Sequence, residues 1–150
     1  MKTRMFPLLA VSLLALSLSA CDGVDPNSPL GKRKALFKDM LHTSESLGGM
    51  LRGRLTFDAQ RFAADAIRLD QLSAQPWQYF PEAKEAKSSA RDDVWQRQAR
   101  FKALADDLQR QTHALAAASA AQPLAPSTVE PLVKRVEDSC EACHKEFRAY

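Results

Sequence analysis

The residues best suited to chemistry in this sequence are Cys140, Cys143 and His144, within the run Cys-Glu-Ala-Cys-His. Two cysteines three positions apart, followed at once by histidine, form the attachment motif of c-type haem. On a helix, positions i and i+3 face the same way, so both thiols can add to the two vinyl groups of one porphyrin. His144 is close enough to coordinate the iron of that ring. The motif therefore predicts one covalent haem c, with His144 as the proximal iron ligand.

Two other chemistries use cysteines at this spacing. A redox-active disulfide of the thioredoxin type needs a strand–loop–helix setting, whereas this motif lies deep in a predicted C-terminal helix. A zinc site needs further ligands, and the chain offers no second Cys-x-x-Cys and only His42 and His113 besides His144. Haem is therefore the favoured interpretation. A colourless protein after expression with haem-attachment machinery would support the other two. We expect His42 and His113 to be surface residues.

The N-terminal part of the sequence is typical of a bacterial export signal. Lys2 and Arg4 provide a positive start, and a largely apolar run follows over residues 5–18. A membrane-spanning helix needs about 20 apolar residues, so this run is short for a span and fits the apolar centre of a signal peptide. We therefore expect residues 1–20 to be removed. Export strengthens the haem interpretation, because bacterial c-type haem is attached outside the cytoplasm.

The residues at the expected cleavage site favour a lipoprotein. The run Leu-Ser-Ala-Cys, ending at Cys21, resembles the lipobox, whose cysteine is diacylated and becomes the mature N-terminus. Ordinary cleavage after Ala20 is the alternative, although Leu18 is bulky where that cleavage requires a small residue. The sequence thus predicts a periplasmic protein, lipid-anchored to a bacterial membrane through Cys21; Asp22 favours the inner membrane. Residues 21–31 are rich in turn formers and are expected to be a flexible tether.

Composition limits the mature chain to one ordinary globular domain. Of the 150 residues, 45% are hydrophobic and 26% are charged. Removal of Lys2 and Arg4 leaves 19 basic side chains against 18 acidic ones, in place of the formal charge of +3. This near-neutral balance gives no electrostatic basis for nucleic-acid binding. Apart from the haem motif there is no paired-carboxylate, Ser-His or Cys-His arrangement, so we do not expect an enzyme.

The spacing of apolar side chains predicts an all-α fold. Four stretches have the period of an amphipathic helix, namely residues 32–54, 58–73, 91–120 and 127–148. Residues 74–89 contain two prolines and three aromatic residues, which a regular helix does not accommodate, and are expected to fold over an apolar surface. Together these elements predict an antiparallel four-helix bundle over residues 32–150, with the haem motif near its C-terminus.

Two local features bear on these predicted helices. Gly48 and Gly49 interrupt the first one, each at a cost of about 1 kcal/mol relative to alanine, and indicate either a kink or the close approach of another helix or a flat ligand. Ser127 and Glu130 have the spacing of a capping box at the start of the last helix. Pro131 would then lie in the first turn, where a missing N–H is tolerated.

These features together resemble the cytochrome c-prime family, whose members are four-helix bundles with the haem motif near the C-terminus. The most specific piece is Cys-Glu-Ala-Cys-His-Lys-Glu-Phe-Arg, in which the motif is followed by Phe147 and Arg148. A Pro-Trp-x-x-Phe stretch over residues 76–80 and a Val-Trp pair that precedes Phe101 also match. The resemblance covers residues 32–150.

The resemblance implies roles for five residues. His144 is the proximal ligand, and one apolar residue of the first helix covers the distal side of the haem. The family pattern matches Phe37 to that distal position and Arg33, four residues earlier, to a contact with a haem propionate. Met40 lies one turn after Phe37. It becomes an axial ligand if the first helix is aligned with the family pattern three residues further along. Arg148, one turn beyond His144, is expected to tune the proximal pocket.

Two functions follow from the two distal candidates. With Phe37 over the iron, the haem is five-coordinate and high-spin, and the resemblance implies binding of the small gases NO and, more weakly, CO. With Met40 as a ligand, the protein is a six-coordinate carrier that cycles between Fe(II) and Fe(III) with a redox partner protein, near membrane oxidoreductases. Relatives often form homodimers through their first two helices, and Gly48 and Gly49 would permit such close packing.

Overall fold

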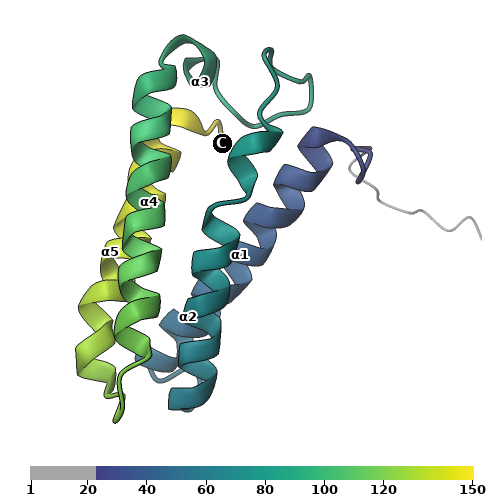
Figure 1. Cartoon of the computed structure of the whole chain (residues 1–150). Helices are drawn as coiled ribbons and strands as arrows, with labels where there is room; N and C mark the ends of the chain where they lie inside the picture. Colours follow the sequence, from purple (N-terminus) through teal and green to yellow (C-terminus); the bar gives the residue numbers. More distant parts are fainter. Residues whose placement is uncertain (1–22) are drawn as a thin grey trace, which may run out of the picture.

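The computed structural model describes residues 23–150, and its long helices form an antiparallel bundle (Figure 1). These helices are α1 (Pro29–Leu51), α2 (Ala59–Ser73), α4 (Gln98–Ser119) and α5 (Pro126–Phe147). Two short elements, the 3-10 helix η1 (Pro76–Tyr79) and α3 (Asp93–Gln96), lie between α2 and α4. Residues 23–150 contain no β-strand, only one isolated bridge. The predicted all-α four-helix bundle is confirmed.

The folded domain begins earlier in the sequence than predicted. Residues 23–28 form bends and turns, and α1 starts at Pro29 rather than at Lys32. The end of the tether predicted over residues 21–31 therefore already belongs to α1. The predicted signal peptide and Cys21 lie outside the described residues. Within residues 23–150, no helix combines the length and the apolar character needed to cross a bilayer.

Side-chain caps fix the starts of α1 and α2. The Oγ of Ser28 accepts a hydrogen bond from the backbone N–H of Gly31 at 3.0 Å. Pro29 takes the first helical position, where its missing N–H would have had no partner within the helix. At α2, the Oδ1 of Asp58 accepts from the backbone N–H of Arg61 at 2.9 Å. Each cap satisfies one of the backbone donors that a helix start leaves unpaired.

The third helix, predicted as one element over residues 91–120, is two helices in the structure. Arg97 leaves helical geometry, with φ −123° and ψ 46°, and separates α3 from α4. The indole N–H of Trp95 in α3 donates to the carbonyl of Pro81 at 2.7 Å, and Val94 is buried. These contacts fix α3 to the preceding connection, so it does not continue into α4. Apolar spacing alone could not show this break, because Trp95 keeps the period of a continuous helix.

The capping box predicted at the start of α5 is also wrong. The helix begins at Pro126, with Ala125 as N-cap and no side-chain hydrogen bond at the cap, so Ser127 lies inside the first turn. The fixed φ of a proline suits the first helical position and starts the helix without a hydroxyl cap. Pro131 consequently lies inside the helix and beyond its first turn, where its ring removes the bond to the carbonyl of Ser127.

The helix faces meet in two apolar clusters. In the bundle, α4 packs on α2 and α5, and α1 packs on α2 and α5. The larger cluster runs along all four long helices and includes Met40, Leu47, Phe62, Leu115 and Val129. The smaller cluster lies where α3, α4 and the end of α5 meet. It is formed by Val94, Leu104 and Phe147, with Phe101 and Cys143 packed against it. Cys140 packs against the larger cluster, so both cysteines of the haem motif lie at the edge of a packed core.

The two glycines of α1 leave room for side chains of the residues that follow the helix. Gly48 and Gly49 are buried, and a Cβ at Gly48 would clash with the guanidinium of Arg52. A Cβ at Gly49 would meet the side chain of Leu55 at 3.2 Å. Arg52 also pairs with Glu137 of α5 at 2.9 Å. Within the described chain, the nearest atoms that a Cβ at these glycines would meet thus belong to side chains just beyond α1.

Candidate haem site

Cys140, Cys143 and His144 lie on one face of the last turns of α5, and each is half-buried. Their spacing of i, i+3 and i+4 places neighbouring side chains on the same side of a helix. All three line a cavity of about 680 Å³ whose other lining residues come from all the remaining helices and from the connection that leads to α3. The structure thus brings the whole motif to one open cavity.

Burial keeps both thiols protonated and the imidazole neutral at neutral pH. It raises the pKa of Cys140 and of Cys143 to about 11, with nearby negative charges adding to the effect. Redox-active Cys-x-x-Cys pairs have lowered cysteine pKa values, so the two thiols do not suit disulfide exchange. Burial also lowers the pKa of His144, and the positive charge of Arg148 lowers it further. The neutral ring is the form that binds a metal.

The described part of the chain gives no support to the zinc alternative. Within residues 23–150, no group of three or more His, Cys, Asp or Glu side chains is arranged to hold a metal ion. His42 and His113 are exposed, as predicted. They lie beside Glu45 at 3.7 Å and Asp70 at 3.3 Å, respectively. Of the three histidines, His144 alone lines the cavity that the two thiols of the motif share.

The two distal candidates of α1 line the same cavity as the motif. Phe37 is half-buried, whereas Met40 is 6% exposed and belongs to the larger apolar cluster. Leu41, four residues after Phe37, also lines the cavity, yet 56% of its surface is exposed. An exposed leucine at such a wall is apolar surface that a bound flat ligand would cover.

A chain of aromatic rings crosses the cavity wall from α1 to α5. The ring of Phe37 meets Trp77 edge-on at 5.9 Å between centroids, and Trp77 stacks on Phe80 at 6.5 Å. Phe80 contacts Phe101 at 4.9 Å, and Phe101 contacts Phe147 at 5.3 Å, both in edge-to-face geometry. The aromatic residues after α2 therefore pack on an apolar surface, as their composition predicts.

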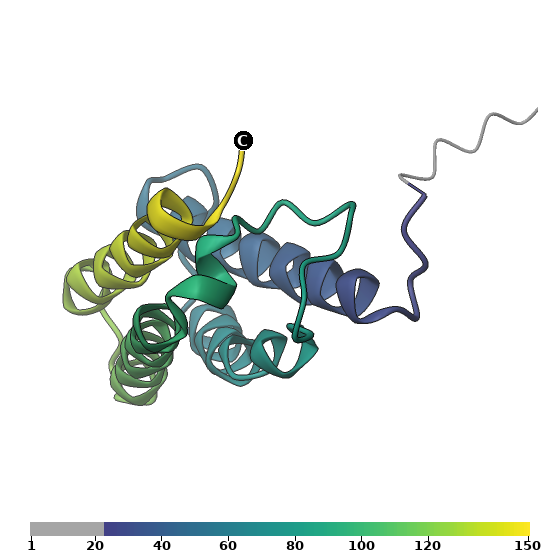
Figure 2. The same cartoon turned by 90° about the horizontal axis from the view of Figure 1, so that it is seen from above.

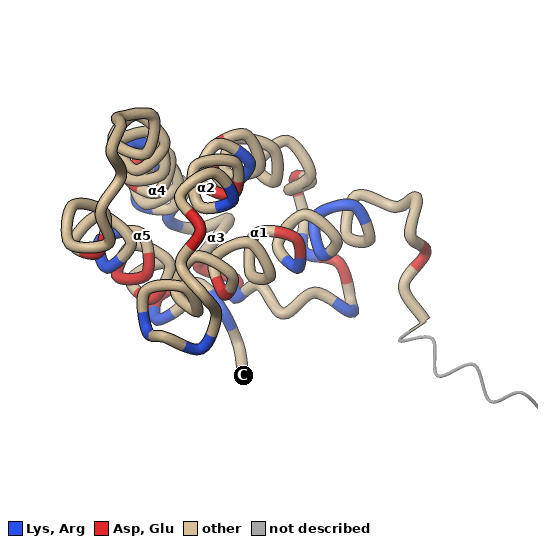
Figure 3. Tube along the Cα trace, turned by 90° about the horizontal axis from the view of Figure 1, so that it is seen from below, with Lys and Arg blue, Asp and Glu red and all other residues tan. Residues whose placement is uncertain are grey.

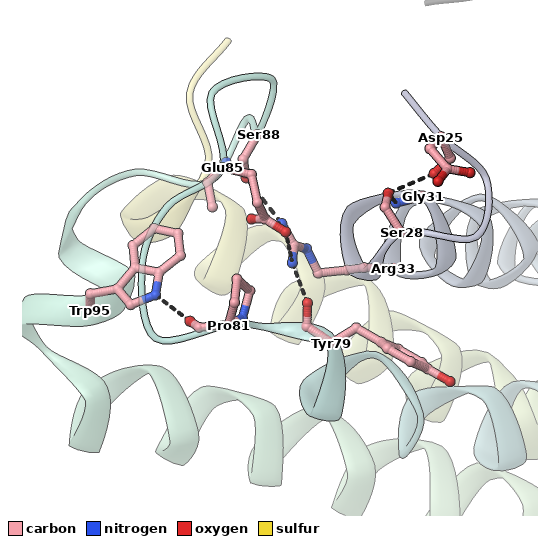
Figure 4. Close-up of polar contacts among 10 residues, drawn as sticks. Asp25, Ser28, Gly31, Arg33, Tyr79, Pro81, Glu85, Ser88 and Trp95 are labelled. Carbon is pink, nitrogen blue, oxygen red and sulfur yellow. Dashed lines mark hydrogen bonds and ion pairs between the residues drawn. The ribbon is translucent and has the colours of Figure 1, made fainter. Parts of the chain in front are cut away.

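Arg33 ties α1 to the connection between η1 and α3, which passes over the end of the bundle beside α1 (Figure 2). Only 3% of its surface is exposed. Its Nη2 donates to Glu85 Oε2 at 3.0 Å and to Ser88 Oγ at 3.1 Å, and its Nη1 donates to the carbonyl of Tyr79 (Figure 4). The guanidinium carbon lies 4.1 Å from the centroid of the Phe80 ring.

These contacts add residues that the sequence did not reveal. Glu85 and Ser88 lie in an irregular connection without periodicity, so no pattern marks them as partners of a residue more than fifty positions away. Arg33 lines the cavity, as its expected contact with a propionate requires, but both of its terminal nitrogens already donate to protein groups. A propionate at this position would share Arg33 with Glu85.

Removal of Arg33 is expected to destabilise the folded protein. Arg33→Ala should lower the free energy of unfolding by roughly 1.5–3 kcal/mol, the usual contribution of hydrogen bonds to charged groups. Glu85→Gln should lower the free energy of unfolding by less than Arg33→Ala does. The variant with both substitutions should show a coupling energy of about 1 kcal/mol between the two sites. Chemical denaturation of the haem-loaded protein, followed by circular dichroism, measures these values.

Lys84→Ala is the matched control for this series. Lys84 lies in the same connection and pairs with Asp92 at 3.0 Å, but both side chains are exposed. Its loss should change stability by less than about 0.5 kcal/mol. Equal stabilities of Arg33→Ala and Lys84→Ala would contradict the structural importance given to Arg33.

Arg148 lies next to the motif, as its position one turn beyond His144 predicts. It is the C-cap of α5, and its backbone N–H donates to the carbonyl of His144 at 3.1 Å. Its side chain lines the cavity, and its guanidinium lies 5.4 Å from the centroid of the Tyr150 ring. After burial, the positive charge of Arg148 is the second cause of the lowered pKa of the His144 imidazole.

The residues present fit a c-type haem. The cavity has the volume typical of cofactor sites, and aromatic and aliphatic side chains form most of its wall. Two protonated thiols and a neutral imidazole from one helix face would provide the attachment points and the axial ligand of such a group. Arg148 and Arg33, the latter paired with Glu85, line the cavity where the propionates would lie.

Comparison with known proteins places the fold and the family of this chain. The family model described as Cytochrome C' matches residues 28–148. Cytochrome c prime from Shewanella frigidimarina has a similar structure, with a TM-score of 0.78 and 24% identity over 84% of this chain and 98% of that one. Among curated protein sequences, none matches this one.

Two further structures carry small gases. Both are variants of cytochrome c prime from Alcaligenes xylosoxidans that are 26% identical to this chain. The nitric oxide complex has a TM-score of 0.75 and covers 83% of this chain and 98% of its own. The form with bound carbon monoxide has a TM-score of 0.76 and covers 85% and 98%. Because the family match spans nearly the whole described domain, this chain belongs to the cytochrome c' family of c-type haem proteins.

Proposed function

We propose that this cytochrome c' holds one covalently attached haem c with a five-coordinate iron and binds the small gases NO and CO at the surface of a bacterial membrane. The observation that carries the proposal is the placement of Cys140, Cys143 and His144 on one cavity wall, with Phe37 on the wall contributed by α1. When bound, the haem supplies an iron that exchanges one electron and accepts a diatomic ligand.

The side chains of α5 attach and orient the cofactor in this proposal. Cys140 and Cys143 each form one thioether link, and the neutral imidazole of His144 occupies the proximal position. The helix holds all three groups at fixed spacing, so one rigid element sets the position of the iron relative to the cavity. Arg148 carries a positive charge beside His144 and is proposed to tune the proximal side.

Phe37 is proposed to cover the distal side. Its ring is held edge-on by Trp77, which limits its movement away from the cavity. A phenyl group donates no hydrogen bond, so it gives no help to dioxygen, which needs a polar distal donor. It also crowds any ligand that binds linearly. Nitric oxide binds ferrous haem strongly enough to overcome this crowding. The similar proteins with bound nitric oxide and carbon monoxide support the choice of gases.

Met40 supports a second candidate, a six-coordinate electron carrier. It lines the cavity on the same helix as Phe37, and a thioether is a known axial ligand of cytochromes. Such a protein would exchange electrons with a redox partner protein at the membrane. The burial of Met40 among Leu47 and other core residues favours a packing role and hence the five-coordinate form.

The membrane location rests on the sequence of residues 1–21. The apolar run after Lys2 and Arg4 and the lipobox that ends at Cys21 support export, lipidation and periplasmic anchoring, with Asp22 favouring the inner membrane. In a bacterial host that matures c-type cytochromes, the full-length protein should be found in the membrane fraction, and Cys21→Ser should not be anchored by lipid. Equal distribution of the two forms would contradict the lipid anchor.

Optical spectra of the purified protein test the haem proposal. We expect a high-spin spectrum when it is oxidised and a marked change when CO is added after reduction. Both results are expected because His144 would be the single protein ligand of the iron, and Phe37 on the distal side has no atom that can bind it. A low-spin oxidised spectrum with no response to CO would overturn the gas-binding function and favour the carrier with Met40.

A further inference from the structure

The described chain contacts the rest of the domain from its first residue onward. The Nζ of Lys87 donates to the carbonyl of Gly23 at 2.6 Å. Asp25 accepts hydrogen bonds from Asn27 and from Ser28, and Ser28 caps α1. The short segment before α1 therefore contacts the start of that helix, as Asp25 and Ser28 show (Figure 4), and it contacts the connection between η1 and α3 through Lys87.

Very little chain separates this fixed segment from Cys21. Only Asp22 lies between Cys21 and Gly23. Two residues span at most about 7 Å when fully extended. A diacylglycerol on Cys21 would therefore hold Gly23 within about 7 Å of the lipid attachment point, whatever the conformation of the link.

Gly23 lies at the end of the bundle that carries the haem motif. We name this the haem end, formed by the start of α1, residues 81–92, α3 and the C-terminus (Figure 1). The opposite end is formed by residues 52–58 and 120–125. Since α1 has 23 residues, the two ends are separated by about 34 Å along that helix.

We propose that the haem end lies against the lipid bilayer, so that the cavity and the last turn of α5 are held beside the membrane surface. This inference rests on the proposed lipidation of Cys21. A flexible tether of eleven residues, as predicted over residues 21–31, would let the domain tumble. The link in the structure is too short to turn the opposite end towards the lipid without breaking the contacts of Gly23 and Ser28.

Charge does not by itself select this orientation. The exposed side chains of the haem end include Lys32, Lys84 and Lys87 but also Asp25 and Glu82, so both signs occur there. Figure 3 shows basic residues on the first turns of α1 and an acidic residue on the segment before that helix. The orientation should therefore persist at high salt, unlike one set by attraction to anionic lipids.

One aromatic side chain adds to the fit of this end with a bilayer. Tyr150 is 96% exposed, the most exposed large hydrophobic residue of the described chain, and it lies at the C-terminus within the haem end. Tyrosine is favoured at membrane–water interfaces, because its ring is apolar and its hydroxyl stays hydrated. The guanidinium of Arg148 over this ring would face the lipid phosphates.

Nitroxide labels at the two ends test the orientation. Glu82→Cys labels the haem end and Ala121→Cys labels the opposite end; both positions are exposed. The lipidated, haem-loaded full chain is placed in phosphatidylcholine vesicles with and without lipids that carry chelated Ni²⁺. We expect the Ni²⁺ lipids to enhance relaxation several-fold more at position 82 than at 121, in low and in high salt.

A longer link is the matched control. Insertion of about 15 Gly and Ser residues between Asp22 and Gly23 gives a flexible span of about 20 Å, which should remove most of the difference between the two labels. Equal enhancement at both positions in the original chain, with acylation of Cys21 shown by mass spectrometry, would overturn the orientation but leave the anchor. Absence of the acyl groups would overturn the anchor and this inference together, while the haem proposal would stand on its spectra.

Discussion

Protein in which Cys140 and Cys143 are both replaced by serine is expected to contain no covalently attached haem. The two thiols are the described cysteines of the chain, and both line the cavity on α5. A seryl hydroxyl does not replace the thiol in thioether formation, so His144 alone would have to retain the cofactor by coordination. Intact-mass spectrometry after denaturation should show the polypeptide without added porphyrin, and solvent extraction should remove all of the colour.

Each single serine variant should keep one link and therefore hold haem at a lower yield. Glu141→Gln is the matched control, because Glu141 is an exposed residue inside the same motif and should leave attachment unchanged. If the denatured double variant still carried the added mass of a haem, the assignment of the two cysteines as attachment points would be wrong. If the unmodified protein carried none, the proposed function would fail as a whole.

Shortening Phe37 is expected to give the largest change in gas binding. Phe37→Ala removes the ring that Trp77 holds at the cavity wall, so a ligand on the distal side no longer meets that crowding. We expect CO affinity to rise by about tenfold or more, which corresponds to about 1.4 kcal/mol of binding free energy. Titration of the reduced protein with CO, followed by its visible absorption, gives the dissociation constants directly.

The matched change at the competing distal residue is Met40→Leu. This substitution keeps the apolar volume in the core, so it should alter stability by less than about 1.5 kcal/mol. It should leave the oxidised spectrum and the CO affinity unchanged. A low-spin oxidised spectrum that becomes high-spin in Met40→Leu, together with no effect of Phe37→Ala, would identify Met40 as the iron ligand and reverse the two roles.

Local chemistry explains why parts of the fold could be predicted. Cys140, Cys143 and His144 are neighbours along one helix, so their relative placement depends only on helical geometry, and the structure places all three at one cavity. The cap of α2 by Asp58 is equally local, because its side chain bonds to the backbone N–H three residues later. The capping box at Ser127 failed because a competing local signal, Pro126, starts the helix two residues earlier.

Predictions that depended on distant contacts were incomplete. The break at Arg97 is accompanied by the bond between Trp95 and Pro81, and the Arg52 side chain beside Gly48 is paired with Glu137 of α5. Neither contact leaves a trace in apolar periodicity, because periodicity reports only which face of an element is buried and not what packs against it.

The amino-acid sequence by itself determined the helical pattern and the haem motif, and it is the basis of the proposed export signal, because each is encoded by residues close together in the chain. Only the tertiary structure decided that Glu85 and Ser88 hold Arg33, that Gly23 is fixed by Lys87, and how the cavity is walled. These contacts join irregular segments to helices, and irregular backbone has no repeating pattern from which its position can be derived.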